Sequence, residues 1–365
     1  MTLPPLTQIP PHVSSVADYE ALARGRMSEG AWAYFAGGAG DEWTLRENAA
    51  AFDRLPLRTR ALRDMRGAST RTSLFGCDLA APILLAPVAF QRMAHPDGEL
   101  ATVLAAGAID LPMVVSTQAS LPIEAIAAEA AAPLWFQLYI QSDREFTAAL
   151  VERAERAGYR ALVVTVDAPV NGMRWREQRA GFALPPGIEA VNLKGMRALP
   201  PARPDALLFG TPLLESAPGW DAIDWLRGIT TLPILLKGIA DPEDARRALA
   251  HGADGIIVSN HGGRTLDGMP AAIDLLPPVV EAVAGAVPVL VDGGIRRGTD
   301  VLRALALGAS AALVGRAYLF ALAAAGAVGV AHVLRLLRAE LELAMALTGC
   351  PDIAAIDRGV LAARA

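Results

Sequence analysis

The sequence predicts an α/β fold, a (β/α)8 TIM barrel, and three observations carry this prediction. Short runs of aliphatic residues recur eight times, and each run ends in polar or glycine residues. Most segments between these runs have the pattern of amphipathic helices. The chain has 365 residues, 53% of them hydrophobic, which suits one large barrel or two average domains. A doubly wound open sheet is the alternative, but eight repeats favour closure.

The expected strands are continuous apolar segments, as a parallel sheet requires when helices cover one face and side chains fill the other. They span residues 82–86, 112–115, 134–136, 161–164, 233–236, 255–258, 288–291 and 311–314. Between strands, residues 142–158 and 241–252 each show an acidic first turn and a glycine at the end, which predicts a helix.

The remaining segments complete a plan of one domain, residues 1–365, because no linker divides the chain. An interval of 70 residues separates Asp167 from Lys237, and it contains proline-rich stretches before a helix resumes near Trp220. Such a long loop predicts an active-site lid with mobile parts. The expected parts are a loose tail at 1–14, an N-terminal helical cap at 15–80, the barrel at 81–345 with its lid at about 168–218, and a C-terminal segment at 346–365.

Composition excludes several classes of protein. The net charge is −5 and the charges are interleaved, so we expect no nucleic-acid partner. Cys77 and Cys350 are too few for a disulfide framework or a metal cluster, and we expect two buried cysteines in a reducing compartment and no metal. The first residues lack the features of a secretion signal, which favours a cytoplasmic protein.

One segment has to be weighed as a membrane span. Residues 317–334 contain no Asp, Glu, Lys or Arg over 18 positions. They are mostly Ala and Gly, with few of the bulky apolar residues of a lipid-facing helix. A buried or subunit-facing helix is the better interpretation, and we expect no membrane partner.

The sixth expected strand ends abruptly at His261, Gly262, Gly263 and Arg264. Histidine exchanges protons near neutral pH, and arginine offers a planar fork for a carboxylate or phosphate. A base and an anion-binding group therefore lie three residues apart just past a strand, where barrel enzymes place catalytic residues.

Glycines and arginines follow the seventh and eighth strands. Asp292, Gly294 and Arg296 come after the seventh strand, and Gly315 and Arg316 after the eighth. Backbone N–H groups, a helix N-terminus and guanidinium groups at these positions favour a phosphate site. Taken alone, each glycine turn could equally be a tight loop.

The other strand ends suit an electron-rich heterocycle. Ser116, Gln137 and Thr165 can donate and accept hydrogen bonds along its edge, although strand-end hydrogen bonding explains Ser116 and Thr165 equally well. Lys237 can hold negative charge that develops on a reduced ring. A purely structural role is disfavoured, because burying an unpaired lysine is costly. Asp167 can orient a nearby histidine and favour its protonation.

Together these motifs resemble the FMN-dependent L-2-hydroxy-acid oxidase and dehydrogenase family, which includes glycolate oxidase, lactate oxidase and the mandelate-oxidising enzymes. The similarity runs from about residue 15 to about 357. The matching segments are 34–42, 86–96, 136–139, 165–169, 236–238, 259–264 and 292–297, in the family's order.

The resemblance implies FMN across the barrel mouth and a small 2-hydroxy acid beside it. It assigns the phosphate to Gly294, Arg296, Gly315 and Arg316, and further cofactor contacts to Pro87, Val88, Ala89, Ser116, Gln137, Thr165, Lys237, Ser259 and Asp292. It assigns the substrate to Tyr34, Gln118, Tyr139, Arg174, His261 and Arg264. Without the resemblance, Tyr34 would be interpreted as a packing aromatic of an N-terminal helix.

The implied reaction is oxidation of an L-2-hydroxy acid to the 2-oxo acid, with O2 reduced to H2O2. His261 would take a proton, with Asp167, Tyr34, Tyr139 and Lys237 as the other catalytic residues. The sequence does not distinguish hydride transfer from a carbanion route. The family also implies a homo-oligomer, a tetramer or octamer.

Two positions depart from the family pattern. Thr265 stands where glutamine is usual, and Gln118 stands where glycolate oxidases carry a tryptophan. A strict preference for glycolate is therefore disfavoured, and lactate, longer aliphatic and mandelate-like substrates remain open, with Phe90 and the lid residues deciding among them. The alternatives are a dehydrogenase that uses a quinone or cytochrome, a lactate 2-monooxygenase, a flavin-independent phosphate-binding isomerase or aldolase with Lys237 as the reactive amine, and a non-catalytic barrel.

Overall fold

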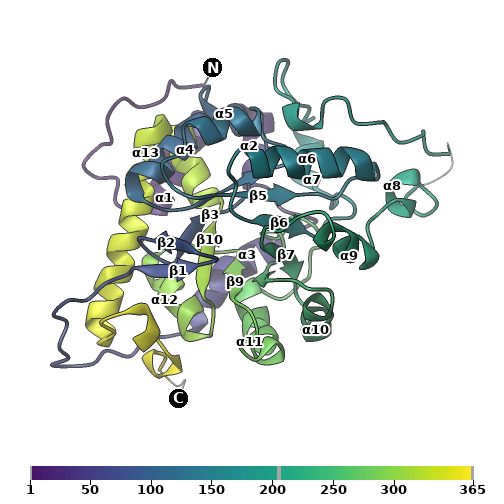
Figure 1. Ribbon diagram of the computed structural model, residues 1–365. Coiled ribbons are helices and arrows are strands. Elements are labelled where there is room, and N and C mark those ends of the chain that lie inside the picture. Colours follow the sequence, from purple (N-terminus) through teal and green to yellow (C-terminus); the bar gives the residue numbers. More distant parts are fainter. Residues whose placement is uncertain (1, 204–206, 363–365) are drawn as a thin grey trace.

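The computed structural model describes residues 2–203 and 207–362, and its centre is a closed parallel barrel (Figure 1). The strand order around the barrel is β10-β3-β4-β5-β6-β7-β8-β9: consecutive strands of the chain pair with each other, and β10 pairs with β3 to close the barrel. The strands are β3 (Ile83–Leu85), β4 (Met113–Ser116), β5 (Leu134–Leu138), β6 (Leu162–Thr165), β7 (Ile234–Ile239), β8 (Gly255–Val258), β9 (Val289–Asp292) and β10 (Ala311–Val314). The eight predicted strands and the (β/α)8 barrel are confirmed.

Both faces of the barrel strands are buried, which explains their continuous apolar sequences. One set of alternate residues fills the barrel interior, with Trp135, Val163 and Ile257 among its members. The other set, which includes Phe136, Val164 and Val258, packs against the surrounding helices. Strands of this kind carry hydrophobic residues at every position, because neither face meets water.

The N-terminal region places three helices and a hairpin around the barrel. The helices are α1 (Val16–Arg24), α2 (Glu29–Ala36) and α3 (Trp43–Ala50), and the 3-10 turn η1 (Ala51–Arg54) follows. The antiparallel hairpin of β1 (Thr72–Leu74) and β2 (Cys77–Leu79) was not predicted. Its apolar residues join the interior cluster near Trp135, and Phe75 packs edge-on against that ring. The hairpin therefore closes the barrel near the N-terminal ends of the strands.

The helices that follow the strands cover the outside of the barrel. They are α4 (Gly98–Ile109), α5 (Ile123–Ala128), α6 (Arg144–Arg156), α9 (Asp221–Arg227), α10 (Pro242–Ala250), α11 (Ala272–Val283), α12 (Gly298–Ala306) and α13 (Arg316–Thr348), with the 3-10 turns η2 (Gln91–Met93), η4 (Ile353–Ala355) and η5 (Arg358–Val360). Asp143 and Asp241 cap α6 and α10, because each side chain accepts a hydrogen bond from a first-turn N–H. The two predicted helices are confirmed, as is the helix near Trp220.

Helix α13 contains the long uncharged segment. It is long and apolar enough to cross a membrane by composition alone, yet 78% of its most apolar window is buried inside the molecule. Non-helical backbone angles at Ala325 and Gly326 divide it, and it packs against α1, α4 and α12. The prediction of a buried helix at this position is confirmed.

The segment between β6 and β7 makes the longest excursion from the barrel (teal in Figure 1). It contains short helical pieces that the sequence pattern did not predict: α7 (Trp175–Arg179), η3 (Val191–Leu193) and α8 (Pro212–Glu215). Residue 1 of the expected tail, residues 204–206 of the expected lid and residues 363–365 of the C-terminal segment lie outside the described residues. Cys77 and Cys350 are both free and buried, as expected.

Candidate active site

The polar ends of the strands meet at a cavity of about 380 Å³. This volume lies in the range of small-molecule sites in proteins. Almost every residue predicted for the site lines this cavity: Tyr34, Pro87, Val88, Ala89, Ser116, Gln118, Gln137, Tyr139, Thr165, Arg174, Lys237, His261, Arg264, Asp292, Gly294, Arg296, Gly315 and Arg316. Asp167 and Ser259 do not line the cavity but contact the lining residues His261 and Lys237.

His261 and Asp167 form a base and its orienting carboxylate. His261 Nδ1 lies 2.9 Å from Asp167 Oδ1, so the imidazole donates from Nδ1 and keeps Nε2 free to accept a proton. Burial alone raises the pKa of Asp167, but the facing His261 and Lys237 outweigh it and hold that pKa below its usual value. Asp167 therefore stays ionised and can stabilise an imidazolium at His261.

Two backbone positions place this pair. His261 has a φ of 55°, a left-handed conformation that a non-glycine residue adopts rarely and that clusters at functional sites. Gly238 has a φ of 109°, and a Cβ at this position would lie 2.5 Å from the Asp167 side chain. A glycine after Lys237 is therefore needed for Asp167 to reach the histidine.

Lys237 is fully enclosed between two acceptors. Its Nζ lies 2.8 Å from Asp292 Oδ2 and 2.9 Å from Ser259 Oγ. Burial lowers the pKa of Lys237, but Asp292 and Asp167 outweigh it, and the net shift is upward. Lys237 is thus a permanent cation on the cavity wall. Ser259 is buried, and its Oγ accepts hydrogen bonds from Lys237 Nζ and from the His261 N–H; its expected contact with the cofactor stays a prediction.

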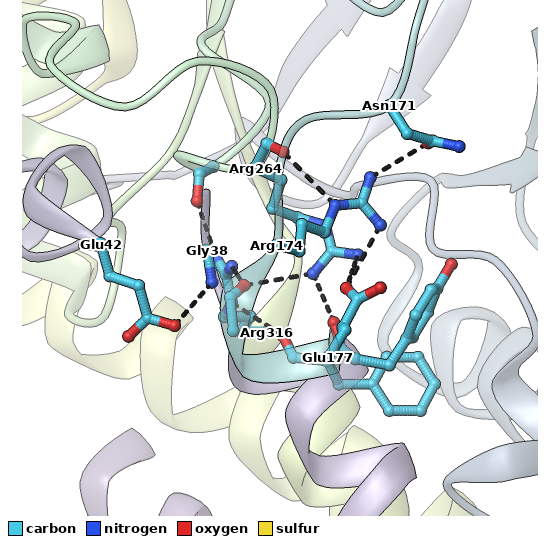
Figure 2. Close-up of polar contacts among 11 residues, drawn as sticks. Gly38, Glu42, Asn171, Arg174, Glu177, Arg264 and Arg316 are labelled. Atoms are coloured by element: carbon cyan, nitrogen blue, oxygen red, sulfur yellow. Dashed lines mark hydrogen bonds and ion pairs between the residues drawn. The ribbon is translucent and has the colours of Figure 1, made fainter. Parts of the chain in front are cut away.

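Arg264 and Arg174 lie together at one side of the cavity (Figure 2). Arg264 donates to the Tyr34 and Gly37 carbonyl oxygens, and its guanidinium carbon lies 4.9 Å from the centre of the Tyr34 ring. Arg174 Nε donates to the Arg264 carbonyl oxygen at 3.4 Å. Two adjacent guanidinium groups form a binding site for a small anion.

Two phenols complete this side of the cavity. Burial raises the pKa of Tyr34, although Arg264 and Arg174 partly oppose the shift. Burial and then Asp167 raise the pKa of Tyr139. Both hydroxyl groups therefore remain protonated well into alkaline pH and can donate hydrogen bonds to a bound carboxylate or hydroxyl.

The opposite end of the cavity has the features of a phosphate site. Gly294 has a φ of 81°, and a Cβ there would lie only 1.9 Å from the Asn48 carbonyl oxygen. Helix α13 begins at Arg316, so its first N–H groups face this end. Arg296 also lines the cavity and pairs with Glu20 at 2.7 Å.

Arg316 lines the cavity, as expected, and its side chain also holds neighbouring main chain. Its guanidinium group donates to the carbonyl oxygens of Phe35, Gly37 and Gly262 at 2.8–3.0 Å, which ties the N-terminal segment to the loop after β8 (Figure 2). Burial, followed by Arg264 and Arg296, lowers the pKa of Arg316 to about 9. The cavity is therefore rich in cations, which favours an anionic ligand.

The remaining polar groups suit FMN. Asp292 Oδ1 is buried without a hydrogen-bond partner among the described residues and lines the cavity, so it can accept from a ligand hydroxyl. Ser116 Oγ donates to Gln137 Oε1 at 3.2 Å, and Gln137 Nε2 donates to Thr165 Oγ1 at 3.1 Å. These three residues therefore form hydrogen bonds with one another, as the interpretation by strand-end hydrogen bonding predicted. They also line the cavity. A cation-rich end, a polar edge and Lys237 fit the phosphate and ring of FMN.

Several cavity residues were not singled out from the sequence. They include Leu45, Asn48, Glu177, Phe182, Leu184 and Leu319. Phe182 stacks on Tyr34 with ring centres 4.9 Å apart, although 148 positions separate them in the sequence. Of these residues, only Glu177 could have been found from the local sequence, because it follows Arg174 by three residues, a spacing typical of ion pairs on a helix.

A second cavity of about 520 Å³ adjoins the first beneath the segment between β6 and β7. The two cavities share Gln118, Tyr139, Thr165, Asn171, Arg174 and His261. Its other walls include Leu193, Met196, Leu213 and Trp220. Within the described residues, no cluster of His, Cys, Asp or Glu is arranged to hold a metal ion.

Comparisons with known proteins agree with this geometry. The chain is 47% identical to an L-lactate oxidase of Nostoc sp., over 94% of this chain and 96% of that protein. It is 46% identical to glycolate oxidase 1 of Zea mays, over 95% of each. A crystal structure of mandelate oxidase with 3,3-difluoro-2-hydroxy-3-phenylpropionic acid superposes with a TM-score of 0.87 at 44% identity, covering 96% of this chain and 99% of that one. Residues 23–363 match the family described as FMN-dependent dehydrogenase, and the chain belongs to that family.

Proposed function

We propose that this chain is an FMN-dependent oxidase that converts L-2-hydroxy acids to 2-oxo acids and reduces O2 to H2O2. One observation carries the proposal: the His261–Asp167 pair and the Arg174–Arg264 pair face the same cavity. A proton acceptor beside a carboxylate-binding site matches the two functional groups of a 2-hydroxy acid. The names of the L-lactate oxidase and glycolate oxidase relatives support this substrate class.

In the proposed reaction, Arg174 and Arg264 bind the substrate carboxylate, and the Tyr34 and Tyr139 hydroxyl groups orient the substrate by hydrogen bonds. His261 then takes a proton from the substrate at Nε2, and Asp167 stabilises the imidazolium that forms. FMN, when bound, accepts the two electrons that leave the substrate. Lys237, held as a cation by Asp292, keeps positive charge at the wall where the ring is expected.

The state of Lys237 argues against the isomerase or aldolase alternative. A Schiff base requires a neutral amine, which enzymes obtain by lowering the lysine pKa. Lys237 shows the opposite, because its ion pair with Asp292 raises the pKa. The geometry therefore favours an electrostatic role for this residue.

The substrate side chain is proposed to extend past Gln118. Gln118 lies where the main cavity and the second cavity adjoin, so a methyl, longer aliphatic or phenyl group has room on that side. The solved mandelate oxidase complex with benzoyl-formic acid, 44% identical to this chain, supports an aromatic side chain as one candidate. Comparing L-lactate, L-2-hydroxyhexanoate and L-mandelate by kcat/KM would rank the three classes.

The first test is spectroscopic. The purified protein should be yellow, should bleach on anaerobic addition of an L-2-hydroxy acid, and should recover its colour in air with formation of H2O2. Bleaching without recovery in air would favour the dehydrogenase, and acetate with CO2 from lactate would favour the monooxygenase. A protein that cannot be loaded with FMN would contradict the proposal.

The base assignment has its own test. The His261→Ala variant should retain FMN, because His261 lies at the substrate side of the cavity, but substrate should no longer reduce it at a measurable rate. Unchanged reduction would remove His261 as the proton acceptor.

Assembly and location are proposed as a cytoplasmic homo-oligomer, a tetramer or octamer. Exposed apolar side chains on α4 and α13, namely Leu104, Val328, Leu343 and Leu347, support a subunit contact there. Light scattering after size exclusion would give the mass of the assembly, and cell fractionation would test its location.

A further inference from the structure

Glu177 lies inside the cavity in contact with both arginines of the proposed carboxylate site (Figure 2). Its Oε1 lies 3.3 Å from Arg174 Nη1 and 3.5 Å from Arg264 Nη2. All three side chains are 14% exposed, so solvent screens their charges only partly. A carboxylate of the protein itself thus shares the guanidinium groups that a substrate carboxylate needs.

The main chain that carries Glu177 is fixed on the side away from the cavity. The preceding residue, Arg176, forms an ion pair with Glu42, which also accepts a hydrogen bond from the Gly38 N–H at 3.0 Å. The Gly40 N–H donates to the Met173 carbonyl oxygen at 2.8 Å, just before α7. Helix α7 is therefore fastened to the N-terminal segment, which holds the main chain of Glu177 at the cavity.

The contacts of Glu177 also leave the arginines able to bind a ligand. Charge-assisted hydrogen bonds between nitrogen and oxygen are typically about 2.7–2.9 Å long. The distances from Glu177 Oε1 are longer, at 3.3 Å and 3.5 Å, so neither guanidinium group is saturated by it. The two cations and Glu177 together carry one net positive charge, which a single substrate carboxylate neutralises.

We infer that Glu177 is a specificity-determining residue that restricts the site to 2-hydroxy acids with one carboxylate and disfavours 2-hydroxy dicarboxylates. This inference rests on the proposed function. The first carboxylate neutralises the net charge of the cluster of Arg174, Arg264 and Glu177, so a second carboxylate near this cluster would meet the negative charge of Glu177 in a partly buried setting. Like charges in such surroundings repel strongly, because the effective dielectric constant is low.

The experiment compares two substrates of similar shape, L-2-hydroxy-4-methylpentanoate and L-malate, whose side chains differ mainly by a carboxylate in place of an isopropyl group. It uses the FMN-loaded wild type, Glu177→Gln and Glu177→Asp. Glu177→Gln should raise the ratio of kcat/KM for L-malate over the monocarboxylate by about tenfold or more, because the repulsion is gone. Glu177→Asp keeps the charge and should hold the ratio within about twofold of the wild-type value.

Calorimetric titration with succinate and 4-methylpentanoate gives the same comparison without turnover, so it works even if a variant is inactive. An increase in relative succinate affinity in Glu177→Gln alone supports the inference. The inference is overturned if the ratio of the two affinities is unchanged in Glu177→Gln, or if Glu177→Asp changes this ratio as much as Glu177→Gln does. Failure of the proposed function is distinguishable, because then neither substrate would reduce the flavin of the wild type.

Discussion

Two carboxylates of this site each pair with a functional side chain. Asp167 faces His261, and Asp292 faces Lys237. Breaking one member of a buried pair leaves an uncompensated group, which is more costly than the pair is stabilising. The chemical roles of His261 and Lys237 are therefore properties of their partners as much as of the side chains.

The first prediction concerns the Asp167→Asn variant. The amide cannot stabilise an imidazolium, so the rate of flavin reduction by substrate should fall by about 100-fold or more. Anaerobic stopped-flow absorbance measures this rate. The matched control is Asp224→Asn, because His251 and Asp224 form a pair of similar geometry, 2.8 Å, at the surface away from the cavity. Equal effects of the two substitutions would contradict the assigned role of Asp167.

A second prediction follows from the lowered pKa of Asp167. A carboxyl whose pKa is lower in the folded state than in the unfolded state stabilises the fold above the unfolded pKa, about 3.9, and the stabilisation is lost as the pH falls through the folded value. The excess of the wild type over Asp167→Asn in free energy of unfolding should therefore shrink as the pH falls below about 4. Urea titrations at each pH measure this difference, and a difference that grows in acid would contradict the ion pair.

At the scale of elements, the glycines of the strand-to-helix loops decide how closely the chain can approach the cavity. The third prediction compares Gly294→Ala with Gly285→Ala. Both glycines have positive φ, 81° and 78°, but a Cβ meets the Asn48 carbonyl oxygen at Gly294 and nothing within 4 Å at Gly285. Gly285→Ala should lower the free energy of unfolding by about 1–2 kcal/mol, which is the strain of a left-handed alanine, and should retain FMN.

Gly294→Ala should lower the free energy of unfolding by about 3 kcal/mol or more, because the clash of the new Cβ with the Asn48 carbonyl oxygen adds to the strain. It should also weaken FMN binding, because the loop has to move. The absorbance ratio of flavin to protein gives FMN content, and chemical denaturation gives stability. Retention of FMN at the wild-type affinity by Gly294→Ala would show that this loop does not form the cofactor site.

Elements that depend on local pattern could be predicted, and elements that depend on distant partners could not. The barrel strands have apolar residues at every position, so their sequence alone marks them. The hairpin of β1 and β2 has only three residues in each strand, and it forms because its apolar side chains enter the barrel interior. Helix α7 has five residues and is held by Glu42, which lies 134 positions before Arg176.

The same limit applies within the site. Residues at strand ends, such as His261 and Lys237, could be placed because the carboxyl ends of parallel strands meet at one face of the barrel. Ser259 was placed at the site for the same reason, and its side chain accepts a hydrogen bond from Lys237. Glu177 and Phe182 lie in the segment between β6 and β7, where no strand period determines which side chains face the cavity.

At the scale of the whole molecule, the cavity concentrates positive charge that the protein does not fully neutralise. Burial contributes most to the lowered pKa of Arg316; Arg264 and Arg296 lower it further, and Glu20 and Glu42 compensate only in part. Concentrated like charge destabilises a compact state. An anion bound at this end should therefore contribute to the stability of the entire barrel, whose first and last segments both meet there.

The last prediction is that removing FMN lowers the melting temperature by several degrees. A ligand that binds only the folded state stabilises it by about 2.7 kcal/mol at a hundredfold excess over its Kd. Inorganic phosphate should restore part of the loss in the apoprotein, because it occupies the cation-rich end without the ring, whereas chloride at equal ionic strength should restore less. Differential scanning calorimetry measures all three states. Equal melting temperatures for the apoprotein and the FMN-bound protein, or equal effects of phosphate and chloride, would contradict a phosphate site at Gly294, Arg296 and the start of α13.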